Sequence, residues 1–463
     1  MPIIKNSFPN ATEKERMKTL DKYDKLYDNR QQEVLLLHQI IRKQYKNIED
    51  LVYLGHAIPA KVSDFYGDFV QGDADRMTLD YVDDDSQIEI FNQIVEDNDI
   101  VESIHDWAVD QSTFGYEVLL GYVEDNKFYI QDVDCDQYFP QADGSVIFAT
   151  YFRDTKNLAG LMDETVAPLL LYTQTYEELN GKVTITRQVW STDVDGMAVD
   201  DLGEEALKAY FDKEASEILD IDEIPVVQID NGKTTKWGFG KSDYADIMPQ
   251  LAEINERRTH VATQLLKNLD AKIELPERED MKGDNGSLKY FEYIMRADKN
   301  EPETRYITNE NPLIEATENH ITSQLKMISY ITDVPMWQLT DSSAQPETVG
   351  GMKIKMFSAL RKTDRKRMKM KKGVEKIIEI GFKMLGKEMN GVVELEFSDV
   401  LPNDNLEDAQ VEEVKVRNGI SSRRSAIKRL ENYSEEDLDW EMQQIKNEEV
   451  ESGAVNPNDV PVL

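Results

Sequence analysis

The chain has 463 residues, which is enough for about two to four domains with a substantial hydrophobic core. Hydrophobic residues make up 40%, including 20 Tyr and 15 Phe, so the composition excludes an acidic disordered protein. The formal net charge of -37 argues against tight nucleic-acid binding by the outer surface, because such binding depends on Lys and Arg that displace counterions from phosphates. The single cysteine, Cys135, excludes an intramolecular disulfide and a multi-cysteine metal site. No apolar run reaches the roughly 18 residues of a membrane span, so we expect no membrane partner.

The first hundred residues predict helices. Residues 12–54 are rich in helix formers and contain neither Pro nor Gly, which predicts one long helix. A second amphipathic stretch covers 60–73, and apolar residues recur at helical spacing from Ile90 to Trp107.

The pattern changes from helical to strand-like after Gly115. Short runs of β-branched and aromatic residues alternate with turn signals up to residue 192, and Asn180-Gly181 is a strong hairpin signal. Residues 193–217 are acidic, and we interpret them as a surface excursion.

Two long helices are predicted around a small β unit. A strand beginning near Ile224 leads through a Gly-rich loop to a helix over 243–269, which Ser242 caps and acids in the first turn favour. Short strand patterns fill 270–311, and Asn311-Pro312 opens a second helix that ends near Pro335. Because each helix has a narrow apolar stripe, we expect both to pack against other helices. The fold class predicted from all these elements is α+β.

A strongly basic helix stands out against the acidic whole. From Lys353 to Lys372 there are ten Lys or Arg and one acid, Asp364, within a helix expected from Met352 to Leu385. The basic face has three interpretations: a solvated surface, a direct DNA contact, or contact with the acidic surface of a neighbouring copy. We favour the third, since complementary patches fix the register between like-charged subunits. The residues proposed for this intersubunit contact are Lys362, Arg365, Lys366, Arg367 and Lys369.

No motif in the sequence supports catalysis. Asp132, Asp134 and Asp136 alternate as in a calcium loop, but Gln137 stands where the EF-hand needs Gly and strands flank the segment, so a solvated turn is the preferred interpretation. Gly238–Ser242 lacks the spacing of a phosphate loop and is interpreted as a strand-to-helix turn. The five His are scattered singly. We therefore predict no metal site, no cofactor and no enzymatic activity.

The order of these elements resembles the portal, or head-to-tail connector, proteins of tailed bacteriophages, especially those of siphophages of Gram-positive hosts. The likeness covers most of 50–450. It rests on Ile224-Pro225-Val226-Val227 with Gly240, Ser242-Asp243 and Asn255, on the long basic helix, and on Leu401-Pro402-Asn403 with Gly419-Ile420-Ser421-Ser422. This chain departs from the family in having Gly350-Gly351 where relatives often have Ser-Gly, and the acidic segment 193–217 has no counterpart.

The resemblance implies a ring, usually of twelve subunits, at one capsid vertex of the virion, assembled in the host cytoplasm, an expectation that the absence of a signal-like N-terminus suits. Its implied partners are double-stranded DNA that passes through, the terminase large subunit, the major capsid and scaffolding proteins, and a head-completion adaptor. The implied parts are a wing (1–240), stem helices (241–270 and 312–334), a clip (271–311), a tunnel loop (335–351), a long wing helix (352–390), and a crown with a C-terminal tail (391–463).

The tunnel loop is the expected DNA contact. A conduit must not hold the DNA that it passes, and uncharged polar residues contact phosphates without gripping them. The residues proposed to line the channel are Trp337, Gln338, Thr340, Asp341, Ser342, Ser343, Gln345 and Thr348, with Gly350 and Gly351 as a hinge. The alternative is another virion structural protein, an adaptor or capsid component, which has no DNA channel.

Overall fold

The computed structural model describes residues 4–35 apart from 6, 54–73, 77–82, 85–154, 167–232, 238–268, 272–276, 293–296, 305–307, 312–335, 339, 349–398, 405–431, 438 and 440–445. The chain divides into two compact units. The larger comprises Met1–Ala344 and Met356–Ser398, and the smaller comprises Gln345–Lys355 and Asp399–Leu463. Within the described residues, no helix is both long and apolar enough to cross a membrane.

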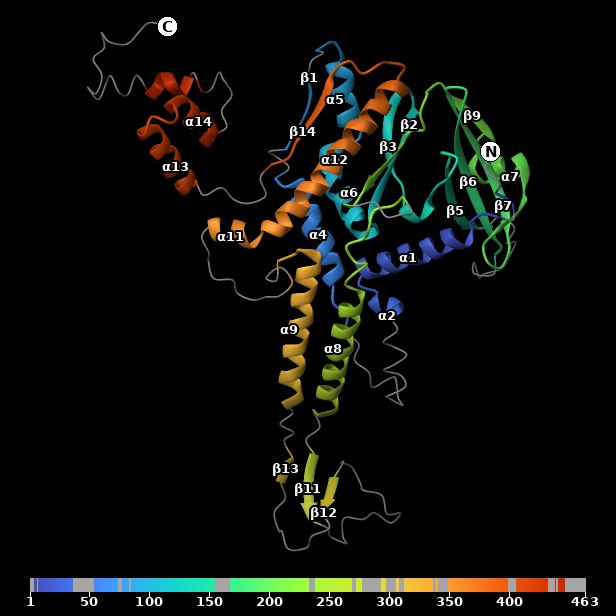
Figure 1. The fold of residues 1–463 in the computed structure, drawn as a ribbon. Coiled ribbons are helices and arrows are strands. Elements are labelled where there is room, and N and C mark those ends of the chain that lie inside the picture. Colours follow the sequence, from blue (N-terminus) through green and yellow to red (C-terminus); the bar gives the residue numbers. More distant parts are fainter. Residues whose placement is uncertain are drawn as a thin grey trace, which may run out of the picture. The chain divides into compact units, whose positions relative to one another are not determined.

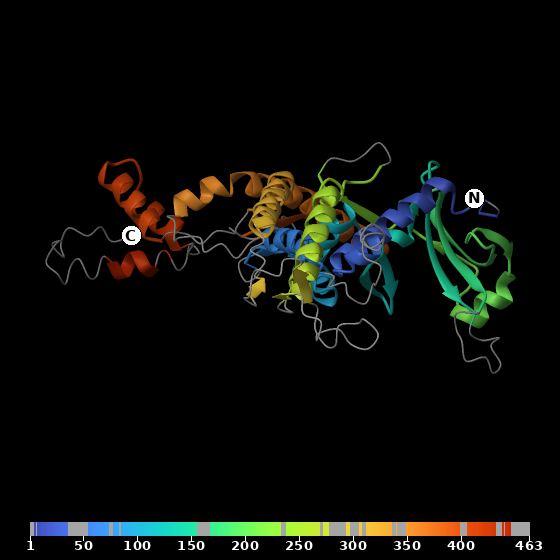
Figure 2. The ribbon, with the colours of Figure 1, turned by 90° about the horizontal axis from the view of Figure 1, so that it is seen from below.

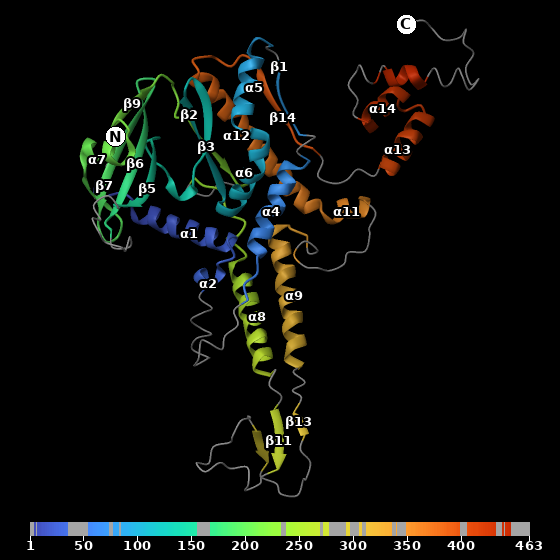
Figure 3. The same cartoon turned by 180° about the vertical axis from the view of Figure 1, so that it is seen from behind.

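The main core of the larger unit lies between a three-stranded antiparallel sheet and several helices. The sheet has the order β10-β2-β3, formed by Val226–Asp230, Tyr116–Glu124 and Lys127–Asp132. The helices are α4 (Ile58–Gln71), α5 (Ile88–Asp97), α6 (Ile100–Phe114) and α12 (Phe357–Met384). Figure 3 shows α5, α6 and α12 gathered around β2 and β3. Their apolar side chains form one cluster that includes Ile104, Trp107, Leu119 and Ile377.

A strand pair extends this core. Strand β14 (Val392–Glu396) confirms the strand expected at 392–397, and it pairs antiparallel with β1 (Thr78–Val82). Val393 and Leu395 face the core, whereas alternate residues of β14 are exposed. A short 3-10 turn, η3 (Asp85–Gln87), leads from β1 to α5.

A second sheet has six strands, and together with β2 and β3 it confirms the strand-like pattern expected after Gly115. Its order is β4-β5-β6-β7-β8, with β9 also paired to β7. The strands are Tyr138–Pro140, Val146–Arg153, Leu169–Leu179, Lys182–Thr192, Ala198–Asp201 and Ser216–Leu219, and η4 (Cys135–Gln137) precedes them. Asn180 and Gly181 join β6 to β7 with φ of 57° and 74°, as the hairpin signal predicts.

The acidic segment 193–217 is mostly exposed, as expected of a surface excursion, but it also has regular structure. Strands β8 and β9 pair with β7, and helix α7 (Gly203–Phe211) packs on the sheet between them, as Figures 1 and 2 show in green. Leu207 is buried there with Tyr172 and Val189. The acidic side chains of this segment point to solvent, while a few apolar side chains attach it to the sheet. The average composition of the segment does not show these apolar contacts.

The long N-terminal helix predicted over 12–54 is interrupted. Helix α1 (Ala11–Tyr27) begins with a capping box between Asn10 and Glu13. It ends at Asp28–Asn29, where Asn29 has a φ of 57° and the Arg30 amide donates to the Lys25 carbonyl. A single turn, α2 (Gln31–Val34), follows. The remainder of the predicted helix, 36–53, lies outside the described residues.

Two antiparallel helices bracket a small β unit, as predicted (Figure 1). Helix α8 spans Met248–Asn268, and α9 spans Pro312–Thr332. Between them, β11 (Lys272–Pro276), β12 (Tyr293–Arg296) and β13 (Arg305–Ile307) form a sheet in the order β12-β11-β13. The stripes expected to pack are buried at Leu251, Ile254, Ile321, Leu325 and Ile328. Leu265 of α8 and Met327 and Tyr330 of α9 are exposed.

The helix predicted from Met352 to Leu385 consists of two pieces. Helix α11 covers Val349–Lys355 and belongs to the smaller unit, whereas α12 begins after a break at Met356. The smaller unit also contains α13 (Asn405–Arg417) and α14 (Arg423–Glu431), joined at Gly419, whose φ is 69°.

Candidate functional site

The basic helix α12 packs unusually close to the sheet through two glycines. A Cβ added to Gly373 would lie 2.4 Å from Cδ1 of Ile229, and one added to Gly381 would lie 2.8 Å from the Phe128 ring. Both distances are shorter than a normal carbon–carbon contact, so any larger residue would have to displace the Ile229 or Phe128 side chain or push α12 off the sheet. This packing fixes which face of α12 meets solvent.

One turn of α12 holds a buried ion-pair cluster. The Lys366 ammonium lies 3.0 Å from Oδ2 of Asp243, and the Lys362 ammonium lies 2.9 Å from Oδ1. The hydroxyl of Ser112 donates to Oδ2 at 2.6 Å. Lys366 is 1% exposed. Burial alone would raise the pKa of Asp243, but the two ammonium groups hold it well below its ordinary value.

Tyr66 covers the other side of both lysines. The two Nζ atoms lie 4.6 and 4.7 Å from its ring centroid, a cation–π arrangement. The Tyr66 hydroxyl and the Lys362 ammonium both donate to the carbonyl of Thr332, the last residue of α9. The cluster therefore ties α12 to α4, to the end of α9 and to the segment that enters α8.

The helix predicted to begin at Asp243 begins five residues later, with Pro249 in its first turn, where proline is tolerated, whereas it would interrupt a helix that began at Asp243. Residues 243–247 form turns, and α8 starts at Met248. Ser242 accepts a hydrogen bond from the Tyr244 amide, as a cap would, and donates to the Thr113 carbonyl. We expected Asp243 to complement a helix dipole. It serves instead as the counter-ion of two lysines, and nothing in the local sequence distinguishes these roles.

Gly240 allows the loop before Ser242 to lie against α6. A Cβ there would lie 2.0 Å from the Gly115 carbonyl oxygen, so only glycine fits. The Gly240 amide donates to Oδ1 of Asp230. This contact supports the interpretation of Gly238–Ser242 as a structural turn.

Arg367 also acts within the subunit. Its Nε donates to the Val70 carbonyl at 3.0 Å, and its guanidinium lies 5.0 Å from the Phe397 ring centroid. Three of the five basic residues proposed for an intersubunit contact, Lys362, Lys366 and Arg367, thus make contacts inside their own subunit. Arg365 and Lys369 are exposed.

The exposed face of α12 borders a basic groove of about 690 Å³. Seven Lys or Arg and three acids line it: Lys241, Lys362, Arg365, Lys366, Lys369, Lys371, Lys372, Asp243, Asp246 and Glu375. Lys241 pairs with Asp246, and Lys371 lies 4.0 Å from Glu375. Across the part of the chain that the structure describes, Arg365, Lys369 and Lys372 form no ion pair. The groove therefore has a surplus of accessible positive charge.

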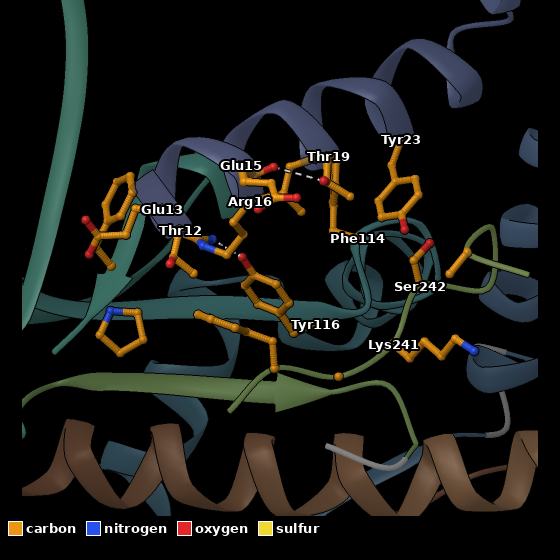
Figure 4. A pocket seen from close by; sticks show the side chains of 16 residues that line it. Thr12, Glu13, Glu15, Arg16, Thr19, Tyr23, Phe114, Tyr116, Lys241 and Ser242 are labelled. Carbon is orange, nitrogen blue, oxygen red and sulfur yellow. Dashed lines mark hydrogen bonds between the residues drawn. The ribbon is translucent and has the colours of Figure 1, made fainter. Parts of the chain in front are cut away.

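A second cavity, of about 540 Å³, lies beneath α1 and is shown in Figure 4. Arg16 points into it and donates to the Tyr116 hydroxyl and to the carbonyls of Cys135 and Tyr138. Its guanidinium also lies within 5 Å of the Phe139 and Phe239 ring centroids. Because protein acceptors and rings already surround it, Arg16 anchors α1 to the sheets and is not an anion site.

Comparison with known proteins identifies the family. The family model described as "Phage portal protein, SPP1 Gp6-like" matches residues 8–453. The chain belongs to this family of phage portal proteins. No curated protein sequence matches it significantly.

Three solved structures resemble this portal protein at low sequence identity. "Neck of native GTA particle computed with C12 symmetry" has a TM-score of 0.41 at 10% identity and covers 81% of this chain and 90% of that chain. "Virion of native gene transfer agent (GTA) particle" has a TM-score of 0.41 at 11% identity, with 81% and 89% covered. "Neck of empty GTA particle computed with C6 symmetry" has a TM-score of 0.42 at 11% identity, with 81% and 90% covered.

The channel-lining residues of the portal protein stay a prediction. Trp337, Gln338, Thr340, Asp341, Ser342, Ser343, Gln345 and Thr348 lie outside the described residues. Gly350 and Gly351 lie in the first turn of α11, so a hinge there would have to bend the start of a helix.

Proposed function

We propose that this portal protein assembles into a ring of twelve identical subunits around an axial channel at one capsid vertex. Double-stranded DNA enters and leaves the capsid through that channel. The observation that carries the proposal is the family match over 8–453, which includes nearly the whole chain. The narrower assignment to siphophages of Gram-positive hosts rests on the resemblance of the sequence motifs alone.

The charge of the subunit suits a conduit. Twelve copies would carry a formal charge of twelve times -37, or -444. An acidic wall repels the phosphate backbone, and the absence of a strong surplus of Lys and Arg keeps DNA from being held by counterion release. The tunnel loop, 335–351, is the proposed part that touches DNA, and Thr340, Ser342, Ser343, Gln345 and Thr348 offer uncharged polar side chains there.

Subunits of such high charge need local compensation where they meet. Arg365 and Lys369, exposed beside the basic groove, are the proposed contacts to the acidic surface of the next subunit. Exposed apolar residues on the paired helices, Leu265, Met327 and Tyr330, favour further packing between subunits.

Each part of the subunit has its own proposed role in this ring. Helices α8 and α9 serve as the stem, and the sheet of β11–β13 serves as the clip, which the terminase large subunit and later the head-completion adaptor contact. Residues 1–240 with α12 form the wing, and 391–463 form the crown, inside the capsid. Capsid and scaffolding proteins contact the ring during assembly in the host cytoplasm.

Electron microscopy of the purified full chain, with native mass spectrometry, tests the proposal. We expect closed rings with an axial opening wide enough for a duplex. Solid particles with no opening would contradict it and favour the alternative, a virion structural protein without a channel.

A further inference from the structure

Three carboxylates from three different elements converge at one end of the β10-β2-β3 sheet. They are Asp110 on α6, Glu117 on β2 and Asp132 at the end of β3. One oxygen of each lies within 4.8 Å of one oxygen of the others. Only Asp132 belongs to the alternating aspartates that the sequence singles out. Asp134 instead accepts a hydrogen bond from Gln137.

The local fold explains the convergence. Asp132 pairs with Leu119 across the β2–β3 ladder, and Glu117 lies two residues before Leu119, so both carboxylates extend from the same face. Gly115, with a φ of 94°, ends α6 and turns the chain directly into β2. The last turns of α6 therefore lie over the start of β2 and bring Asp110 to that face.

Glu117 is a buried carboxylate with an unsatisfied oxygen. The residue is 1% exposed, and its Oε1 has no hydrogen-bond partner. Its cross-strand neighbour is Ile229, a member of the main hydrophobic core. A buried carboxylate in such surroundings is costly unless a cation or a proton neutralises it.

No basic side chain neutralises the cluster. In the described part of the chain, Asp110, Glu117 and Asp132 form no ion pair with Lys, Arg or His. Burial, together with the neighbouring charges of Asp132 and Asp106, raises the pKa of Asp110 to about 7. Burial also raises the pKa of Glu117 well above its ordinary value, and the hydrogen bond and charge of Asp132 act in the same direction. Among the described residues, the site thus gathers three carboxyl groups with no basic side chain beside them.

We propose that Asp110, Glu117 and Asp132 bind one divalent cation of the oxygen-preferring class, Ca²⁺ in the first place. Two oxygens that share a calcium ion at 2.3–2.6 Å lie at most about 5.2 Å apart, so the spacing of the cluster fits one ion. The ligand set contains neither His nor Cys, which disfavours zinc and copper. Exposed Asp132 leaves a path from solvent, and water completes the coordination. The bound ion ties α6 to the β2–β3 hairpin. This inference does not depend on the proposed function.

Thermal unfolding of the full chain tests it. After treatment with EDTA, the protein is titrated with Ca²⁺ and separately with Mg²⁺ at constant ionic strength. We expect the Tm of the wild type to rise by about 2 °C or more and to saturate, because a ligand that binds only the folded state stabilises it. Calorimetry is expected to give one calcium site per subunit.

Three variants distinguish a site from general screening. Glu117→Gln and Asp132→Asn each remove one ligand charge, and both are expected to lose the saturable rise in Tm. Asp134→Asn is the matched control, since it removes a neighbouring negative charge on the same segment and leaves the three ligands intact. It is expected to respond as the wild type does. Asp132→Asn keeps the test meaningful if Glu117→Gln folds poorly, because Asp132 is exposed.

Two outcomes would overturn the proposal. An equal response in all variants would mean that cations screen the acidic surface without a defined site. No response to millimolar Ca²⁺ or Mg²⁺, together with a higher Tm at pH 5 than at pH 7, would mean that protons alone neutralise the cluster.

Discussion

The ammonium of Lys366 lies 3.0 Å from Oδ2 of Asp243, and the lysine is 1% exposed. Burial lowers the pKa of Lys366 to about 8, and the charge of Asp243 opposes that shift. Part of the positive charge of helix α12 is therefore buried inside its own subunit and is not available to a partner. The pair connects the helix with the turn that leads into α8.

Replacing Lys366 with Met is expected to destabilise the larger unit by about 3–5 kcal/mol, because Asp243 then keeps a buried charge with one partner fewer. Urea unfolding followed by circular dichroism measures the effect. Arg365→Met is the matched control, since Arg365, the neighbour of Lys366 on α12, is exposed, and the change is expected to alter the stability by less than about 0.5 kcal/mol. Equal stability of the two variants would contradict a structural role for the pair.

Gly373→Ala is expected to destabilise the protein although alanine favours helices by about 1 kcal/mol over glycine. The added Cβ would lie 2.4 Å from Cδ1 of Ile229 and would force the Ile229 side chain or α12 to shift. Ile229→Ala removes the side chain that the added methyl group meets. The double variant Gly373→Ala/Ile229→Ala should therefore lose less stability than the sum of the two single variants, which a double-mutant cycle in urea unfolding measures. Gly144→Ala cannot serve as the control, although the space around Gly144 is open, because alanine is strained at its φ of 89°. Strictly additive effects would mean that the two residues do not press on each other.

Reversing the exposed basic charge is expected to impair assembly and not folding. Arg365→Glu/Lys369→Glu changes two residues one helical turn apart that line the basic groove. If these residues meet an acidic neighbour, rings should be lost or strongly reduced in native mass spectrometry while the Tm of the subunit stays within about 2 °C.

Lys18→Glu/Lys22→Glu supplies the control for that assembly experiment. These lysines are also exposed and four residues apart on a helix, α1, so the net charge changes equally. The control should keep its rings. Intact rings from the α12 variant would assign its exposed face to solvent or to DNA.

The acidic cluster predicts an opposite pH dependence from that of the ion pair. Asp110 has a pKa of about 7 in the folded protein and 3.8 as its ordinary value, so the folded state binds more protons between these limits. In EDTA, this group makes stability rise as pH falls from about 7 to 4. The lowered pKa of Asp243 acts in the other direction, and its contribution is lost as pH falls below about 4.

Glu117→Gln isolates the cluster in a pH series of Tm values. At a pH high enough to ionise Glu117, the variant should be more stable than the metal-free wild type, because one buried charge is gone. The difference should shrink as pH falls, because the raised pKa of Glu117 makes the folded wild type take up a proton before the unfolded chain does. Parallel curves from pH 8 to pH 5 would show that Glu117 does not carry the buried charge.

Local rules in the sequence suffice for several elements. Asn180-Gly181 favours positive φ at both positions and determines the β6–β7 hairpin. Pro312 and the apolar spacing of 321–328 predict α9 correctly. The same kind of rule fails at Asn29, which ends α1 through two capping hydrogen bonds although its neighbours favour helix.

The sequence by itself determined the α+β class, the helix pair around a small β unit and the membership of the portal family, because these depend on periodicity, turn chemistry and the order of motifs. Only the tertiary structure decided which basic residues are accessible. Periodicity places Lys362 and Lys366 on one face of the helix. Whether that face is buried depends on Asp243, which is more than a hundred residues away in the sequence. It likewise brought Asp110, Glu117 and Asp132 together, since three elements must pack before their carboxylates can meet.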